Sequence, residues 1–254
     1  MIFATDLDNT IVFSHRKLAA DEPNVCCVEY YKGQKISYMT LSALNKLTFV
    51  SENVFLVPAT TRSFSQFKRI EFLPETEFVI IDNGGTILRK GIVIQEWSEH
   101  INKILENYDF SKTLEAFYPM PTLISDPKVV DGKFLFAKVS DAKRSKEYLE
   151  KILDTKKWTI SATGYKLYAF PAEITKGNAL EYIHKKLLNK HHTVVSAGDS
   201  EMDISMLEYS DFGIVPLDCS ISDRQKFIKK GHGIYTADKI LDYVIELNSK
   251  HEYC

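Results

Sequence analysis

Short apolar runs alternate with helix-like segments at both ends of the chain, and this alternation constrains the fold most. The first part contains three predicted strands and two predicted helices: Met1–Ala4, Val54–Val57 and Phe78–Ile81 as strands, Thr40–Val50 and Ser63–Phe72 as helices. Strands that alternate with helices are typical of a parallel sheet with helices on its faces. The sequence therefore predicts an α/β fold.

The middle of the chain breaks this alternation. The predicted order there is a turn-linked pair of strands, a long helix, two strands, a charged helix and two more strands: Thr86–Leu88, Ile92–Gln95, Ser98–Tyr118, a strand near Val129, Phe134–Val139, Ala142–Leu153, Trp158–Ala162 and Lys166–Phe170. Alternation then resumes in five elements: a helix from Lys176, the strand Thr193–Ala197, a helix after Asp203, the strand Phe212–Val215 and the helix Lys239–Ser249. We predict a discontinuous core over residues 1–87 and 169–254, with an inserted α+β domain over residues 88–168.

Composition argues against several classes of protein. Of 254 residues, 44% are hydrophobic and 26% charged, as in ordinary globular proteins. The formal charge of −2 gives no basic excess for nucleic-acid binding, and no apolar run approaches the roughly 20 residues that span a bilayer. The chain enters a strand without a leader-like segment, and its four cysteines fit no zinc or disulfide pattern. We expect a cytoplasmic monomer or weak homodimer with free thiols that binds neither nucleic acid nor membrane.

A hairpin is predicted over residues 25–40, where two β-prone runs flank Lys32-Gly33. Because it follows the N-terminal aspartates closely, one interpretation is a flap over a functional site. An ordinary surface hairpin explains the same pattern equally well, so both interpretations stay open.

Two aspartates, Asp6 and Asp8, follow the first predicted strand. Thr60 and Asn83 also follow predicted strands, and in parallel sheets ligands bind outside the carboxyl ends of the strands. Side chains at i and i+2 of an extended segment point to the same side. One carboxylate can then attack phosphorus while the other handles the proton of the leaving group.

Later segments offer the other parts of a phosphoryl-transfer site. Thr60 offers a hydroxyl and a backbone amide, and Lys176 offers a positive charge at a predicted helix start, where anions are favoured. Asp199 follows a strand and offers a remote carboxylate for Mg²⁺, and Asp203 lies one helical turn further on. Each segment alone also fits a turn, a helix cap or a solvated lysine. Together they indicate a site for a phosphomonoester.

These motifs resemble those of the haloacid dehalogenase superfamily, specifically its Cof-type phosphatases, which are also similar to sucrose-phosphate phosphatases. The four motifs of the superfamily resemble, in order, Asp6-Leu7-Asp8-Asn9-Thr10, Ala59-Thr60-Thr61-Arg62, Thr175-Lys176-Gly177-Asn178-Ala179-Leu180 and Gly198-Asp199-Ser200-Glu201-Met202-Asp203, and Asn83-Gly84-Gly85 resembles a further Asn-Gly-Ala element. The resemblance covers the whole chain and implies a Rossmann-like parallel-sheet core with an inserted α+β cap of the C2B type, residues 88–168, that selects the substrate.

The resemblance also implies a role for each matching residue. Asp6 would be the nucleophile and Asp8 the general acid and base, and with Asp199 they would hold Mg²⁺, Asp8 through its backbone carbonyl. Thr60 and Lys176 would hold the phosphate. The other candidates are Thr61, Arg62 and Asn83 for phosphate or substrate, and Thr10 and Asp203 as supports of the residues that contact it. For Arg62, a structural ion pair is the alternative interpretation.

Two positions depart from the pattern of the group. Thr61 replaces the glycine that usually follows the threonine of the second motif, and its β-branched side chain restricts the backbone beside the phosphate. Met202 replaces the asparagine of the fourth motif, and a thioether cannot donate the hydrogen bonds that an amide supplies. We therefore expect a working phosphatase that is slower or narrower in substrate range.

The leading hypothesis is a Mg²⁺-dependent phosphohydrolase that cleaves a small phosphorylated metabolite, such as a sugar phosphate, through an aspartyl-phosphate. The nearest alternative is a phosphomutase of the phosphomannomutase type, although the fourth motif lacks the longer glycine-containing form of that group. The other alternative is a non-catalytic binding or regulatory protein with this fold, which only Met202 favours.

Overall fold

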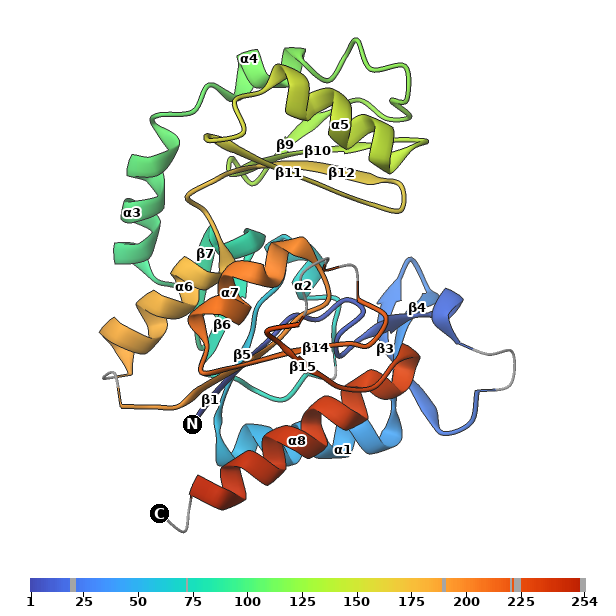
Figure 1. The fold of residues 1–254 in the computed structure, drawn as a ribbon, viewed down its shortest axis with the longest axis vertical. Helices are drawn as coiled ribbons and strands as arrows, with labels where there is room; N and C mark the ends of the chain where they lie inside the picture. The colour runs from blue at the N-terminus through green and yellow to red at the C-terminus, as the bar shows by residue number, and fades with distance from the viewer. Residues whose placement is uncertain (19–21, 72, 189–190, 220, 222–224, 252–254) are drawn as a thin grey trace. The chain divides into compact units, whose positions relative to one another are not determined.

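The computed structural model describes residues 1–18, 22–71, 73–188, 191–219, 221 and 225–251 (Figure 1). The chain forms two compact units. The first contains Met1–Val93 and the residues from Lys176 onward, and the second contains Ile94–Thr175. The predicted division, with a core of residues 1–87 and 169–254 and an inserted domain of residues 88–168, stays a prediction. The strand pair at 86–93 belongs to the first unit.

A five-stranded parallel sheet forms the centre of the first unit, in the order β15-β14-β13-β1-β5. Its strands are β1 (Ile2–Thr5), β5 (Phe55–Pro58), β13 (Val194–Ala197), β14 (Phe212–Val215) and β15 (Ile228–Lys229). All four residues of β1 are buried, as expected for a strand that is covered on both faces. Thr5 pairs with Pro58 on one side and with Ala197 on the other, so the segments after β1, β5 and β13 leave the same edge of the sheet.

Helices cover both faces of this sheet. On one side, α1 (Leu41–Asn53) and α8 (Thr236–His251) pack side by side against the sheet (Figure 1). On the other side, the hydroxyl of Ser196 in β13 donates to the carbonyl of Met206 in α7 (Ile204–Tyr209). The helix α6 (Lys176–Tyr182) packs against α7. These features confirm the predicted α/β fold with a Rossmann-like core.

Two smaller sheets flank the parallel sheet. One is antiparallel and contains β6 (Phe78–Ile81), β7 (Thr86–Arg89) and β8 (Ile92–Val93). The other contains β2 (Phe13–Ser14), β3 (Val25–Tyr31) and β4 (Gln34–Thr40), and Lys32 and Gly33 form its tight turn with positive φ. The predicted hairpin is therefore present. The remaining short elements are η1 (His15–Lys17), α2 (Phe64–Phe67), η2 (Asp82–Gly84), η3 (Ile183–Leu187), η4 (Glu201–Asp203) and η5 (Gly233–Tyr235).

The second unit has α+β architecture. Its antiparallel sheet has the order β11-β12-β10-β9, and α4 and α5 contact it. The elements are α3 (Gln95–Leu105), α4 (Phe110–Glu115), β9 (Lys128–Val130), β10 (Phe134–Lys138), α5 (Ala142–Ile152), β11 (Trp158–Thr163) and β12 (Lys166–Pro171). Alternate residues such as Leu135, Ala137 and Leu167 point to one face and form its core with Leu149 of α5.

Three predicted elements were wrong. The helix over 98–118 is two helices, because Asp109 caps α4 by accepting from the backbone N–H of Lys112 at 2.9 Å. Within the described residues, the helix over 63–72 is limited to α2, and Phe72 lies outside them. The strand over 92–95 ends at Val93 because α3 begins at Gln95.

Two further expectations concern membranes and thiols. In the described part of the chain, no helix combines the length and the apolar character needed to cross a bilayer. Cys26, Cys27 and Cys219 are thiols in the structure, and Cys254 lies outside the described residues.

Candidate active site

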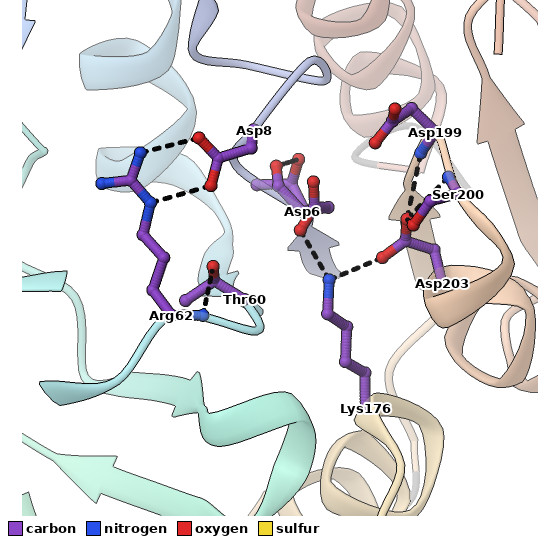
Figure 2. Close-up of polar contacts among 9 residues, drawn as sticks. Asp6, Asp8, Thr60, Arg62, Lys176, Asp199, Ser200 and Asp203 are labelled. Carbon is purple, nitrogen blue, oxygen red and sulfur yellow. Dashed lines mark hydrogen bonds and ion pairs between the residues drawn. The ribbon is translucent and has the colours of Figure 1, made fainter. Parts of the chain in front are cut away.

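The end of β1 places Asp6 at the centre of the candidate site (Figure 2). The backbone N–H of Asp6 donates to Ala197 at 2.8 Å, so the ladder with β13 continues to this residue. Asp6 as a whole residue is only 6% exposed. Beyond it, the carbonyl of Leu7 accepts three backbone N–H groups and closes a tight turn that carries Asp8. The predicted pair of aspartates therefore lies where one strand ends and a turn begins.

Lys176 joins Asp6 to Asp203. Its ammonium group donates to Asp6 Oδ1 at 2.5 Å and to Asp203 Oδ1 at 2.6 Å, and its side chain is only 1% exposed. Burial opposes the charge of Lys176, but the two carboxylates outweigh burial and raise the pKa of the ammonium. Lys176 is therefore a fixed cation at the start of α6. The helix can approach α7 closely because Gly177 has no side chain: a Cβ there would lie 2.4 Å from the carbonyl oxygen of Ser205.

Asp203 shapes the loop after β13. Its Oδ2 accepts from the N–H of Asp199 at 3.1 Å and from both the N–H and the hydroxyl of Ser200 at 2.9 Å. Asp203 is fully buried. A Cβ at Gly198 would lie 2.3 Å from the Cβ of Asp203, so the loop requires glycine at this position. These contacts fix the position of Asp199 beside Asp6, as Figure 2 shows.

The acidic residues of this cluster fit a divalent cation. Oxygens of Asp6, Asp199 and Asp203 lie within 4.8 Å of one another. Burial raises the pKa of Asp6 well above its usual range, and burial together with the charge of Asp203 raises the pKa of Asp199 to about 7. A cation would relieve this accumulation of negative charge. Asp203 already accepts four hydrogen bonds, so Asp6 and Asp199 are the better ligands.

Asp8 points to a different partner, Arg62. The guanidinium donates from Nε to Asp8 Oδ2 at 2.8 Å and from Nη2 to Asp8 Oδ1 at 2.7 Å, a bidentate pair. Nη2 also donates to Glu29 Oε2 at 3.0 Å. Of the two interpretations for Arg62, the structure shows the ion pair, with two carboxylates, and contact with phosphate or substrate stays a prediction. Burial opposes its charge, and Asp8 and Glu29 together raise the pKa of Arg62.

Thr60 lies between β5 and β6. Its hydroxyl accepts from the N–H of Arg62 at 3.1 Å, so the hydroxyl hydrogen can still point to a phosphate oxygen. The predicted use of its backbone amide was wrong, because that N–H donates to the carbonyl of Ile80 at 2.9 Å. The carbonyl of Thr60 accepts from the N–H of Asn83, which is buried with a φ of 57°.

Three other positions singled out in the sequence are buried or half-buried. Thr61 is half-buried, and Thr10 is fully buried, with no partner for its hydroxyl among the described residues. Met202 is 8% exposed in η4. The structure therefore brings together Lys176, Asp6, Asp199 and Asp203 as one group, and Asp8, Arg62 and Thr60 as another.

Glu29 is the residue that the sequence did not reveal. It lies in the predicted hairpin, is 1% exposed and contacts Arg62. A single glutamate in a strand carries no motif, and its partner Arg62 is 33 residues away. The prediction of the hairpin as a flap was the only signal near it, and that function stays a prediction.

Comparisons with known proteins agree with this geometry. The model of the family described as sucrose-6F-phosphate phosphohydrolase matches residues 1–240. Among solved structures, the sucrose-phosphatase from Synechocystis sp. PCC6803, in complex with sucrose and phosphate, has a TM-score of 0.69 at 15% identity and covers 97% of both chains. A phosphatase of the haloalkanoate (HAD) enzyme superfamily from Bacteroides thetaiotaomicron has a TM-score of 0.59 at 15% identity, over 96% of this chain and 94% of its own.

A trehalose-6-phosphate phosphatase related protein has a TM-score of 0.58 at 15% identity, over 99% of this chain and 100% of its own. No curated protein sequence gives a significant match. At these identities the solved structures show the fold, and the family model shows the relationship. The chain therefore belongs to the sucrose-6F-phosphate phosphohydrolase family and is a phosphatase of the haloacid dehalogenase superfamily.

Proposed function

We propose that this protein is a Mg²⁺-dependent phosphohydrolase that cleaves the phosphomonoester of a small metabolite, a sugar phosphate or a related compound, through an aspartyl-phosphate on Asp6. The observation that carries the proposal is the setting of Asp6. It ends the central strand, one of its oxygens is held by the buried ammonium of Lys176 at 2.5 Å, and Asp199 lies beside it. The match to a family of sugar-phosphate phosphatases supports the substrate class.

In the first step, an oxygen of Asp6 forms a bond to phosphorus and the bond from phosphorus to the ester oxygen breaks. The leaving oxygen takes the proton of the Asp8 carboxylic acid. Because Lys176 fixes Asp6 Oδ1, the carboxylate is oriented for attack, and the same ammonium offsets negative charge on the phosphoryl oxygens. The Thr60 hydroxyl donates to one of those oxygens.

In the second step, the Asp8 carboxylate takes a proton from water, and the water oxygen attacks the phosphorus of the aspartyl-phosphate. The bond between phosphorus and Asp6 breaks, which releases inorganic phosphate and restores the Asp6 carboxylate and the protonated Asp8. Mg²⁺ held by Asp6, Asp199 and the backbone carbonyl of Asp8 would neutralise charge on the phosphate. The substrate-selecting role of residues 88–168 and the phosphate-binding roles of Thr61 and Asn83 belong to this proposal.

The test is release of inorganic phosphate from a panel of phosphorylated sugars, nucleotides and cofactors, with p-nitrophenyl phosphate as a general substrate. We expect hydrolysis that depends on Mg²⁺ and a loss of about a thousandfold or more in Asp6→Asn. Asp242→Asn is the matched control, because Asp242 pairs with Lys46 on the helical surface of the same unit. Parent protein without Mg²⁺-dependent hydrolysis, or an Asp6→Asn variant as fast as the parent, would contradict the proposal. An isomeric phosphate as product would instead indicate a phosphomutase.

A further inference from the structure

Glu29 is a buried carboxylate with three polar partners outside the group around Asp6. The Ser37 hydroxyl donates to its Oε2 at 2.6 Å, Arg62 Nη2 lies 3.0 Å from Oε2, and Arg69 Nε lies 3.2 Å from Oε1. The backbone of Glu29 forms a bridge with Ile70, so β3 is also attached to the segment that carries Arg69. Glu29 is therefore fixed from several sides.

Arg62 forms ion pairs with two carboxylates that differ in exposure. Its Nη2 contacts both Asp8 and Glu29, and its side chain is 10% exposed. Glu29 is 1% exposed and held by other groups, whereas the Asp8 side chain is 46% exposed at a turn. A buried guanidinium that loses all its partners is strongly unfavourable. Of its two partners, Asp8 is the one that can leave.

The proposed reaction requires Asp8 to leave Arg62. Both Asp8 oxygens accept from Arg62, at 2.7 and 2.8 Å, so at least one must be released before Asp8 can give a proton to a leaving oxygen or take one from water. When that happens, Glu29 still neutralises Arg62. Without Glu29, the guanidinium would have Asp8 as its one carboxylate partner among the described residues, and Asp8 would be held more firmly.

We propose that Glu29 is a positioning residue for hydrolysis: it is the permanent partner of Arg62 and thereby allows Asp8 to exchange between Arg62 and the reacting atoms. This inference rests on the proposed function, because it assigns Asp8 the transfer of protons. It gives the β3–β4 hairpin a defined chemical contribution, made through Arg62 without contact between Glu29 and substrate.

Glu29→Gln tests this inference because it removes the charge and keeps the shape. With p-nitrophenyl phosphate, whose leaving group departs without a proton, the first step stays fast and the second step still needs Asp8. We expect kcat to fall about tenfold or more, within the contribution of a positioned acid–base group. KM should fall with it, because kcat/KM depends on the first step, which stays fast. Rapid mixing should then show a burst of p-nitrophenol close to one per enzyme. Glu29→Asp, which keeps the charge, should recover part of kcat.

Glu77→Gln is the matched control, because it removes a carboxylate from an exposed pair with Arg89 in the same unit and should leave kcat unchanged. If Glu29→Gln does not fold, Ser37→Ala provides the test. It removes one hydrogen bond from Glu29 and should also lower kcat. An unchanged kcat in the folded variant, or a fall without a burst, overturns the inference. Failure of the proposed function would look different, because the parent itself would then lack Mg²⁺-dependent hydrolysis.

Discussion

Replacement of Lys176 by methionine measures how far one buried ammonium stabilises both the fold and the site. The side chain is 1% exposed and contacts Asp6 and Asp203, whose side chains are 8% and 0% exposed. Methionine fills similar space but leaves two carboxylates without their cation. Removal of one partner from a buried ion pair costs about 3–5 kcal/mol, and because Lys176 serves two carboxylates we expect about 4 kcal/mol or more. That is a large part of a typical free energy of unfolding.

The assay is urea unfolding at neutral pH with a chelator present, followed by circular dichroism. Lys185→Met is the control, because Lys185 forms an exposed pair with Glu181 and its loss should leave the unfolding midpoint unchanged. In the double variant Lys176→Met with Asp203→Asn, one uncompensated charge is removed, so part of the lost stability should return. A loss below about 1 kcal/mol in Lys176→Met, the range of an exposed pair, would refute the reasoning. The reasoning would also be refuted if the double variant lost as much stability as the two single variants together.

Three further predictions concern the loop after β13. The pKa of Asp199 is raised from 3.8 to about 7, so between these values the folded state holds a proton that the unfolded state has lost. The free energy of unfolding should then fall as pH rises through this range, by at most about 4 kcal/mol, and Mg²⁺ should raise the melting temperature more near pH 8 than near pH 5. Equal Mg²⁺ shifts at both values would contradict this. Gly198→Ala should lower the stability by about 1–3 kcal/mol because its Cβ would overlap Asp203, and an unchanged melting curve would show that the loop adapts. Met202→Asn should raise kcat because an amide donates where a thioether cannot, and an unchanged kcat would show that the departure at this position has no catalytic effect.

The sheet was predictable because each of its longer strands is a short apolar run with at most one polar residue. Val194–Ala197 and Phe212–Val215 needed no tertiary information to be recognised. The break between α3 and α4 was not predictable from the sequence, because helical spacing continues through it. Asp109 acts as a cap only when the chain turns there. A side-chain contact decided between one helix and two.

The candidate site was likewise predictable only in part. Asp6 and Lys176, 170 residues apart, were placed together because both belong to motifs at element ends. An ion pair was one interpretation for Arg62, but no sequence pattern identified Asp8 and Glu29 as its partners. Glu29 belongs to no motif, and its importance arises only from the contacts of the folded hairpin. Motif matches locate reacting groups, but they do not show which side chains hold those groups.

Leu7 separates two carboxylates that differ in how long they stay in place. Asp6 continues the ladder of a central strand, where backbone amides exchange with solvent only when much of the domain opens. Asp8 lies beyond Leu7 in a turn, and its half-exposed side chain can change rotamer within nanoseconds once it has left Arg62. Leu7 is fully buried and its carbonyl accepts three amides, so the residue between the two carboxylates is itself firmly held. The chain thus places the proposed nucleophile at the end of a firmly held strand and the proposed proton carrier on a turn two residues away.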